Sequence, residues 1–122
     1  MKIPVLILDG DLRHGRQLAR LVSSQGHPTR ELRSWEQLPE TAGRTVLLVN
    51  LDTVKTDNRD LLEAGRLNSG LIVLTLSQQK FHPELSRAMQ ETVVASLCQP
   101  LDQEELFFWL HSIGEMDQGQ AG

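Results

Sequence analysis

Short apolar runs rich in β-branched residues alternate with helical patterns along this chain of 122 residues. The four strongest runs span residues 3–8, 45–51, 70–76 and 93–98, and a weaker strand is predicted at 29–33. Their apolarity is continuous rather than alternating, which is typical of strands buried on both faces of a sheet. Strands that alternate with helices favour an α/β fold with a doubly wound, five-stranded parallel sheet.

Local start and stop signals place a helix after each strand. Asp11 precedes a helical pattern that ends near Gly26. Ser34 with Gln37 resembles a capping box that opens a short helix ending near Pro39.

The later helices carry similar signals. Asp57 is predicted to cap a helix, and Pro83 suits the first turn of the next one. Asp102 with Glu105 forms a predicted capping box ahead of the last helix. The sequence therefore predicts a strand and a helix repeated five times.

The composition fits one cytoplasmic domain. Twelve basic against sixteen acidic residues give a net charge of −4, which argues against direct binding to nucleic acid or to a membrane surface. No apolar run approaches the roughly 20 residues of a membrane span, and a single cysteine suits a reducing compartment. We expect a domain over residues 1–114, followed by a polar tail or the start of a linker over 115–122.

Polar residues follow the predicted strands. In a parallel sheet, sites form at the carboxyl ends of the strands, near the point where the strand order reverses. The residues to inspect there are Asp9-Gly10-Asp11, Asn50-Leu51-Asp52, Thr75-Leu76-Ser77 and Gln99-Pro100.

These strand ends resemble those of response-regulator receiver domains. The similar segments are residues 6–11, 46–51, 73–75 and 97–102, and the resemblance covers about residues 3–113. It implies the (βα)5 flavodoxin-like, CheY-like receiver fold, with a cis peptide before Pro100. It also implies switching by phosphorylation, which in this family needs an acidic pair for Mg²⁺, a phosphoacceptor Asp and a Lys.

The chain departs from that pattern at the chemical positions. Asp9 keeps the first acidic position, but Gly10 stands at the second, Asn50 at the phosphoacceptor and Gln99 at the Lys. An amide cannot form an acyl phosphate, and Mg²⁺ prefers carboxylate oxygens. Thr75 keeps the hydroxyl of the fourth strand. The substitutions predict a degenerate pseudo-receiver that is not an enzyme and uses no cofactor, Mg²⁺ included.

One alternative keeps phosphorylation. Asp52 lies two residues beyond Asn50 and points to the same side if the strand continues. With Asp9 and Asp11 it would form a shifted acidic site in a metal-dependent phospho-receiver. The simpler interpretation is that Asp11 caps a helix and Asp52 lies solvated on a loop. A further alternative is a small ligand held in the neutralised pocket.

The remaining reactive residues show no catalytic or metal-binding spacing. The four histidines are predicted to have surface or capping roles, and they are His14, His27, His82 and His111. Cys98 lies in an apolar run and is predicted to be a small buried side chain.

The last helix carries the clearest surface signal. At about 100° per residue, Leu106, Leu110 and Ile113 form one buried stripe. Phe108 then points away from the sheet. We expect an interaction surface formed by Phe107, Phe108 and Trp109, because aromatic residues are enriched at interfaces.

These patterns favour a phosphorylation-independent interaction module, the N-terminal part of a bacterial transcription regulator. Its expected partners are a second copy of itself in a homodimer, an attached or separate output domain, or both.

Overall fold

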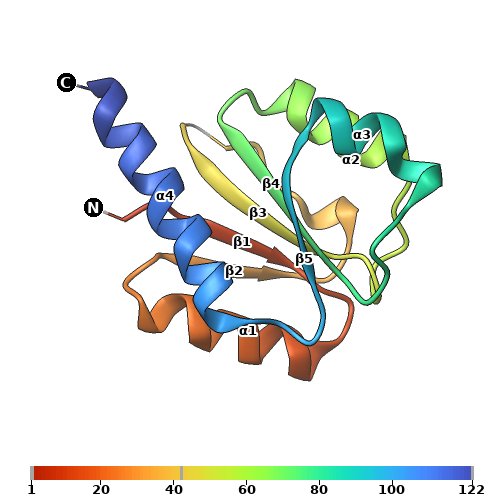
Figure 1. Ribbon diagram of the computed structural model, residues 1–122, viewed down its shortest axis with the longest axis horizontal. Helices are drawn as coiled ribbons and strands as arrows, with labels where there is room; N and C mark the ends of the chain where they lie inside the picture. Colours follow the sequence, from red (N-terminus) through yellow and green to blue (C-terminus); the bar gives the residue numbers. More distant parts are fainter. Residues whose placement is uncertain (1, 42, 122) are drawn as a thin grey trace.

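Five strands form one parallel sheet in the order β2-β1-β3-β4-β5 (Figure 1). They are β1 (Val5–Leu8), β2 (Thr29–Leu32), β3 (Thr45–Asn50), β4 (Leu71–Ser77) and β5 (Val93–Cys98). The computed structural model describes residues 2–41 and 43–121, with side chains described as far as Glu115. The predicted doubly wound sheet is confirmed, and its strand order reverses between β1 and β3.

The described residues also form four α-helices and two single-turn 3₁₀ helices, of which α4 follows the last strand and the others lie between strands. The α-helices are α1 (Leu12–Ser24), α2 (Asn58–Leu67), α3 (Ser86–Glu91) and α4 (Gln103–Ala121), and the 3₁₀ turns are η1 (Trp35–Gln37) and η2 (Pro83–Leu85). The side chain of Asp11 caps α1, and Asp57 forms a capping box with Asp60 at the start of α2. Gly26, just beyond α1, has a φ of +90°, which favours glycine.

The predicted second helix is reduced to the turn η1. Ser34 makes no side-chain capping hydrogen bond. Gln37 instead accepts a hydrogen bond from the backbone N–H of Arg33, 2.7 Å away. Pro39 follows two residues later, so the segment is too short for an α-helix.

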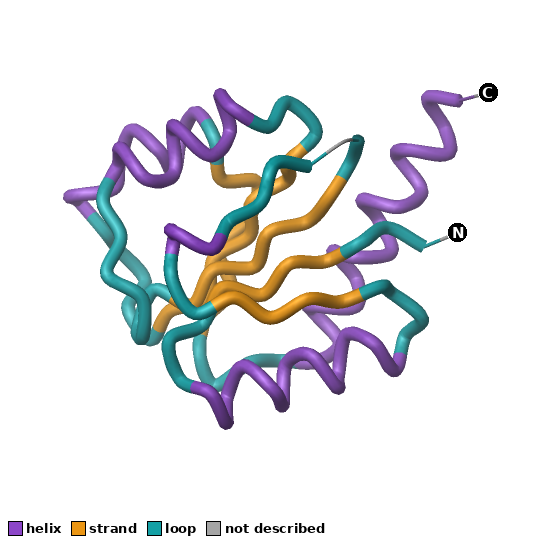
Figure 2. The backbone as a smooth tube through the Cα atoms, turned by 180° about the vertical axis from the view of Figure 1, so that it is seen from behind, coloured by secondary structure: helices purple, strands orange, loops and turns teal. Residues whose placement is uncertain are grey.

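The helices form a layer on each face of the sheet (Figure 2). One core packs against α1 and α4 and includes Leu18, Val22, Leu106 and Leu110. The other core packs against α2 and α3 and includes residues Leu61 and Ala88.

The prediction that Cys98 is buried is wrong, because Cys98 lies on the edge strand β5. Its side chains alternate between the core and solvent, and Cys98 is exposed instead of buried. Val94, on the same side of the strand, is 50% exposed. The physical reason is that β5 has a neighbour on only one side and that α3, with six residues, is too short to cover it.

The helix α4 has the predicted buried stripe. Leu106, Leu110 and Ile113 are at most 3% exposed, whereas Phe108 is 62% exposed. The helix backbone continues to Ala121, although the sequence predicts a polar tail over 115–122. The side chains of that segment beyond Glu115 lie outside the described residues. Within the described part of the chain, no helix is both long and apolar enough to cross a membrane.

Truncating a residue of the buried stripe of α4 should lower the stability of the fold more than truncating the exposed Phe108. Leu110→Ala should lower the free energy of unfolding by about 2–5 kcal/mol, because it removes buried apolar contacts and leaves a cavity. Phe108→Ala should cost about 1 kcal/mol or less, since the Phe108 ring packs mainly edge-to-face on Trp109, whose ring centroid is 5.7 Å away. Chemical denaturation measures both free energies. Equal destabilisation by the two variants would mean that Phe108 belongs to the core.

Candidate functional site

The carboxyl ends of β1, β3, β4 and β5 bring several polar side chains together. Asp9 follows β1 and is fully buried, and Asn50 ends β3 and is 2% exposed. Asp52 and Gln99 follow β3 and β5. We call Asp9, Asn50, Asp52 and Gln99 the strand-end cluster. It lies at the reversal of strand order, where the sequence predicts the site.

The buried carboxylate of Asp9 is fully engaged. Its Oδ1 accepts hydrogen bonds from Thr53 Oγ1 (2.7 Å) and from the backbone N–H of Asp11 (2.9 Å). Its Oδ2 accepts one from Asn50 Nδ2 (3.1 Å) and makes a short contact with His14 Nδ1. Burial by itself raises the pKa of this carboxyl group, but the hydrogen bonds, led by His14, outweigh burial and hold the pKa below its ordinary value.

Asn50 links the two sides of the cluster. Its Nδ2 donates to Asp9, while its Oδ1 accepts from Gln99 Nε2 (3.1 Å) and from the backbone N–H of Asp52 (3.0 Å). An amide can donate and accept in this way, whereas an ionised carboxylate only accepts. The residue at the expected phosphoacceptor position therefore connects the pocket residues by hydrogen bonds in which it both donates and accepts.

Asp52 is also committed to internal partners. Its Oδ2 accepts hydrogen bonds from Gln99 Nε2 and from the backbone N–H of Gln78, both at 2.9 Å. Its Oδ1 accepts from Ser77 Oγ at 3.3 Å. Asp52 is nevertheless exposed and lies in the turn after β3, as the simpler interpretation predicts. It would lose these internal bonds if it acted as the shifted phosphoacceptor.

The described residues hold no group of three or more His, Cys, Asp or Glu side chains arranged to bind a metal ion. The second acidic position of receivers is sterically closed as well. A Cβ on Gly10 would lie 2.4 Å from the carbonyl oxygen of Thr53, so a side chain there would require the backbone to move. Substituting Asp for Gly10 would therefore not simply restore an acidic pair.

Thr75 does not reach the cluster. Its hydroxyl donates to Ser96 Oγ at 3.1 Å, and Ser96 in turn contacts the sulfur of Met89. The β4 hydroxyl that contacts the cluster is Ser77, two residues further along the strand. The side chains of Thr75 and Ser77 point to the same face of the sheet. Only Ser77, the last residue of β4, lies at the carboxyl end of the strand, where the cluster is.

The structure also places three residues at the site that the sequence analysis did not assign to it, two of them histidines for which it predicted surface or capping roles. Thr53 and His14 bind Asp9, and His82 Nε2 lies 3.0 Å from Ser77 Oγ. A local signal existed only for His14, which lies three residues after the helix cap Asp11. Ser77 is 4% exposed, so its contact with His82 does not present a nucleophile to a substrate.

The fifth strand ends as expected. The peptide bond between Gln99 and Pro100 is cis, which confirms the conformation that the resemblance implies.

Solved structures show that the chain has the receiver fold. A CheY-like response regulator receiver domain protein from Methanospirillum hungatei superposes with a TM-score of 0.81 at 14% identity, and each chain is covered in full. The signal receiver domain of an HD domain-containing protein from Pseudomonas fluorescens gives 0.80 at 15% identity, covering 98% of this chain and 92% of that one.

A third similar structure has a different description. A putative pilus assembly-related protein from Burkholderia pseudomallei gives a TM-score of 0.72 at 22% identity, with 93% of this chain and 90% of that chain covered. No protein-family model and no curated protein matches the chain.

The buried carboxylate of Asp9 should make the free energy of unfolding depend on pH. Because the pKa of Asp9 is lower when folded, its stabilising contribution is present above the ordinary value of 3.8 and is lost as the pH falls through the folded value. The difference in unfolding free energy between the wild type and Asp9→Asn should therefore shrink below pH 3.8. Urea titrations at several pH values measure it, and a pH-independent difference would contradict this assignment.

Proposed function

We propose that this domain is a phosphorylation-independent signalling module, a pseudo-receiver that acts through contacts with other proteins. The observation that carries the proposal is the Asn50 amide, hydrogen bonded to Asp9 on one side and to Gln99 on the other. These bonds use the groups that would otherwise bind a metal ion or a phosphoryl group.

The side chains of this site are poorly suited to phosphoryl transfer. Phosphorylation in receivers needs a carboxylate nucleophile, metal-binding carboxylates and a cation facing the phosphoryl oxygens. Asn50 is a neutral amide, the Gly10 position has no room for a side chain, and Gln99 carries no charge. The alternative with Asp52 as phosphoacceptor is less favoured, because its oxygens already have three protein donors.

The proposed interaction surface centres on Phe108 of α4. This ring is 62% exposed and rests edge-to-face on Trp109, which packs against the core. Phe107 points elsewhere and lines a cavity. Of the three aromatic residues, Phe108 is therefore the one able to act as an anchor, with Trp109 as its support.

We propose as partners a second copy of the domain, an output domain, or both. The receiver domain from Pseudomonas fluorescens belongs to a larger HD domain-containing protein, so this fold does serve as one part of a longer chain. We further propose that the present domain is the N-terminal part of a bacterial transcription regulator in the cytoplasm. Its charge of −4 favours a protein partner over nucleic acid.

Phosphodonors should leave the protein unmodified. After incubation with acetyl phosphate and Mg²⁺, intact-mass spectra should show no gain of about 80 Da, the mass of one phosphoryl group formed by acyl-phosphate chemistry. Beryllofluoride with Mg²⁺ should leave the amide chemical shifts around Asn50 unchanged. An acid-labile adduct on Asp52 would instead establish the metal-dependent alternative.

Asn50→Asp is the matched variant for this experiment. It restores a carboxylate at the phosphoacceptor position but leaves Gly10 and Gln99 unchanged, so it should still fail to bind Mg²⁺ tightly or to retain a phosphoryl group. It should also be less stable at neutral pH, because Asp9 loses a donor and gains a neighbouring negative charge.

Removing the Phe108 ring should weaken association. If Phe108 anchors an interface, Phe108→Ala should cost about 2 kcal/mol or more of binding free energy, roughly a 30-fold change in the dissociation constant. Sedimentation measures self-association, and binding to the separately expressed output domain measures docking. Arg59→Ala, on the exposed side of α2, is the control and should change neither. Unchanged association in both assays would remove the support for this surface.

A further inference from the structure

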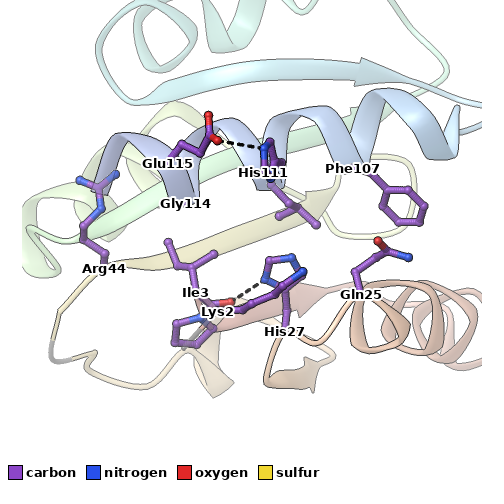
Figure 3. A pocket seen from close by; sticks show the side chains of 11 residues that line it. Lys2, Ile3, Gln25, His27, Arg44, Phe107, His111, Gly114 and Glu115 are labelled. Atoms are coloured by element: carbon purple, nitrogen blue, oxygen red, sulfur yellow. Dashed lines mark hydrogen bonds and ion pairs between the residues drawn. The ribbon is translucent and has the colours of Figure 1, made fainter. Parts of the chain in front are cut away.

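A cavity of about 660 Å³ opens at the amino ends of the strands, whereas the strand-end cluster lies at their carboxyl ends. It lies between α4 and the segment before β1, and residues ahead of β2 and β3 complete its wall (Figure 3). Its volume is within the roughly 300–1,000 Å³ typical of pockets for small molecules.

One part of the cavity wall is apolar. Ile3 and Pro4 contribute from the segment before β1, and Phe107 and Leu110 contribute from α4. Phe107 is the aromatic residue of α4 that neither fills the core nor joins Phe108 on the outer surface. These side chains provide a surface against which the apolar body of a ligand could pack.

His27 supplies a buried polar atom beside this wall. The residue is only 7% exposed, and its Nδ1 lies 2.9 Å from the carbonyl oxygen of Ile3. Because a carbonyl only accepts, Nδ1 carries the hydrogen, and this fixes the orientation of the ring. Nε2 has no hydrogen-bond partner among the described residues. Figure 3 shows the ring on the side of its segment that faces α4.

The charged groups around the cavity favour an anion. Glu115 is the acidic residue in the wall, and it pairs with His111 at 3.2 Å. Lys2 makes no ion pair with any residue whose side chain is described, so its ammonium is available to an anion at the cavity.

We propose that this cavity binds a small molecule that combines an apolar body with one anionic group. The apolar body packs between Ile3 and Phe107. The anionic group pairs with the ammonium of Lys2. Nε2 of His27, an acceptor in the ring whose Nδ1 carries the hydrogen, takes a hydrogen bond from an N–H or O–H of the same molecule. This site is separate from the strand-end cluster and does not depend on the proposed absence of phosphorylation.

Two fluorescent probes of nearly the same shape test the proposal. 1-Anilinonaphthalene-8-sulfonate has an apolar body and one sulfonate, and N-phenyl-1-naphthylamine is the same body without the charge. The sulfonate probe should bind the native protein with a stoichiometry of one. The uncharged probe should have an affinity at least about tenfold lower. Cooperative thermal unfolding, recorded on the same samples, verifies that the folded state binds the probe.

Variants at two positions locate the binding. His27→Asn keeps a side-chain donor for the carbonyl oxygen of Ile3 but removes the atom equivalent to Nε2, so it should weaken sulfonate binding about tenfold. Gly114→Trp should abolish binding, because a Cβ at this cavity-lining position meets no atom within 4 Å and the indole can occupy the space. Gly114→Ala is the matched control and should retain binding.

Each result decides the proposal. Loss of binding in Gly114→Trp, weakening in His27→Asn and preference for the sulfonate together support it. Absence of binding to the wild type, or binding that neither variant changes, would overturn the site. Equal affinity for the two probes would overturn the anionic class of ligand.

Discussion

The buried carboxylate of Asp9 determines how several separate segments meet at the end of the sheet. A charge removed from water costs several kcal/mol unless hydrogen bonds replace its hydration. Asp9 meets this requirement with donors from the start of α1 and from the end of β3, namely the backbone of Asp11 and the side chains of Asn50 and Thr53, and with a contact from His14. Its own backbone oxygen accepts a further bond from Arg33, beyond β2, at 3.3 Å. The position of each of these segments is therefore tied to one ionised group.

Asn50 and Gln99 are suited to this role because they are amides. Asn50 donates to Asp9 and accepts from Gln99, and Gln99 also donates to Asp52, so the two carboxylates are joined by neutral groups. A carboxylate at position 50 would have no hydrogen to donate and would face Asp9 at about the same distance. In this pocket, the two amides at the expected phosphoacceptor and Lys positions provide the hydrogen bonds between the carboxylates of Asp9 and Asp52.

The sequence predicted the features of this fold that depend on local pattern. Continuous apolar runs located the strands, and Asp11 and Asp57 identified two helix starts by a capping bond within three residues. It failed where neighbours in space decide the outcome. The run ending at Cys98 does not indicate that β5 lies at an edge. Likewise, strand alternation cannot distinguish Thr75 from Ser77, which share a face and differ only in how far along β4 they lie. The contact of His14 with Asp9 could not be predicted either, because it depends on how α1 is placed relative to β1.

The two ends of the sheet differ in how completely their polar groups are satisfied, and α4 connects this difference to the outer surface. At the carboxyl ends, the acidic oxygens of the cluster all have protein donors, so an added ligand would have to break existing bonds. At the amino ends, Nε2 of His27 has no partner among the described residues, and Lys2 forms no ion pair there. Phe107 lines that cavity and Phe108, the next residue, faces outward. If a ligand in the cavity changes the free energy of contacts made through Phe108, linkage requires that a partner at Phe108 change the ligand affinity by the same factor. In this arrangement, signalling would depend on occupancy of the amino-end cavity and not on chemistry at the strand-end cluster.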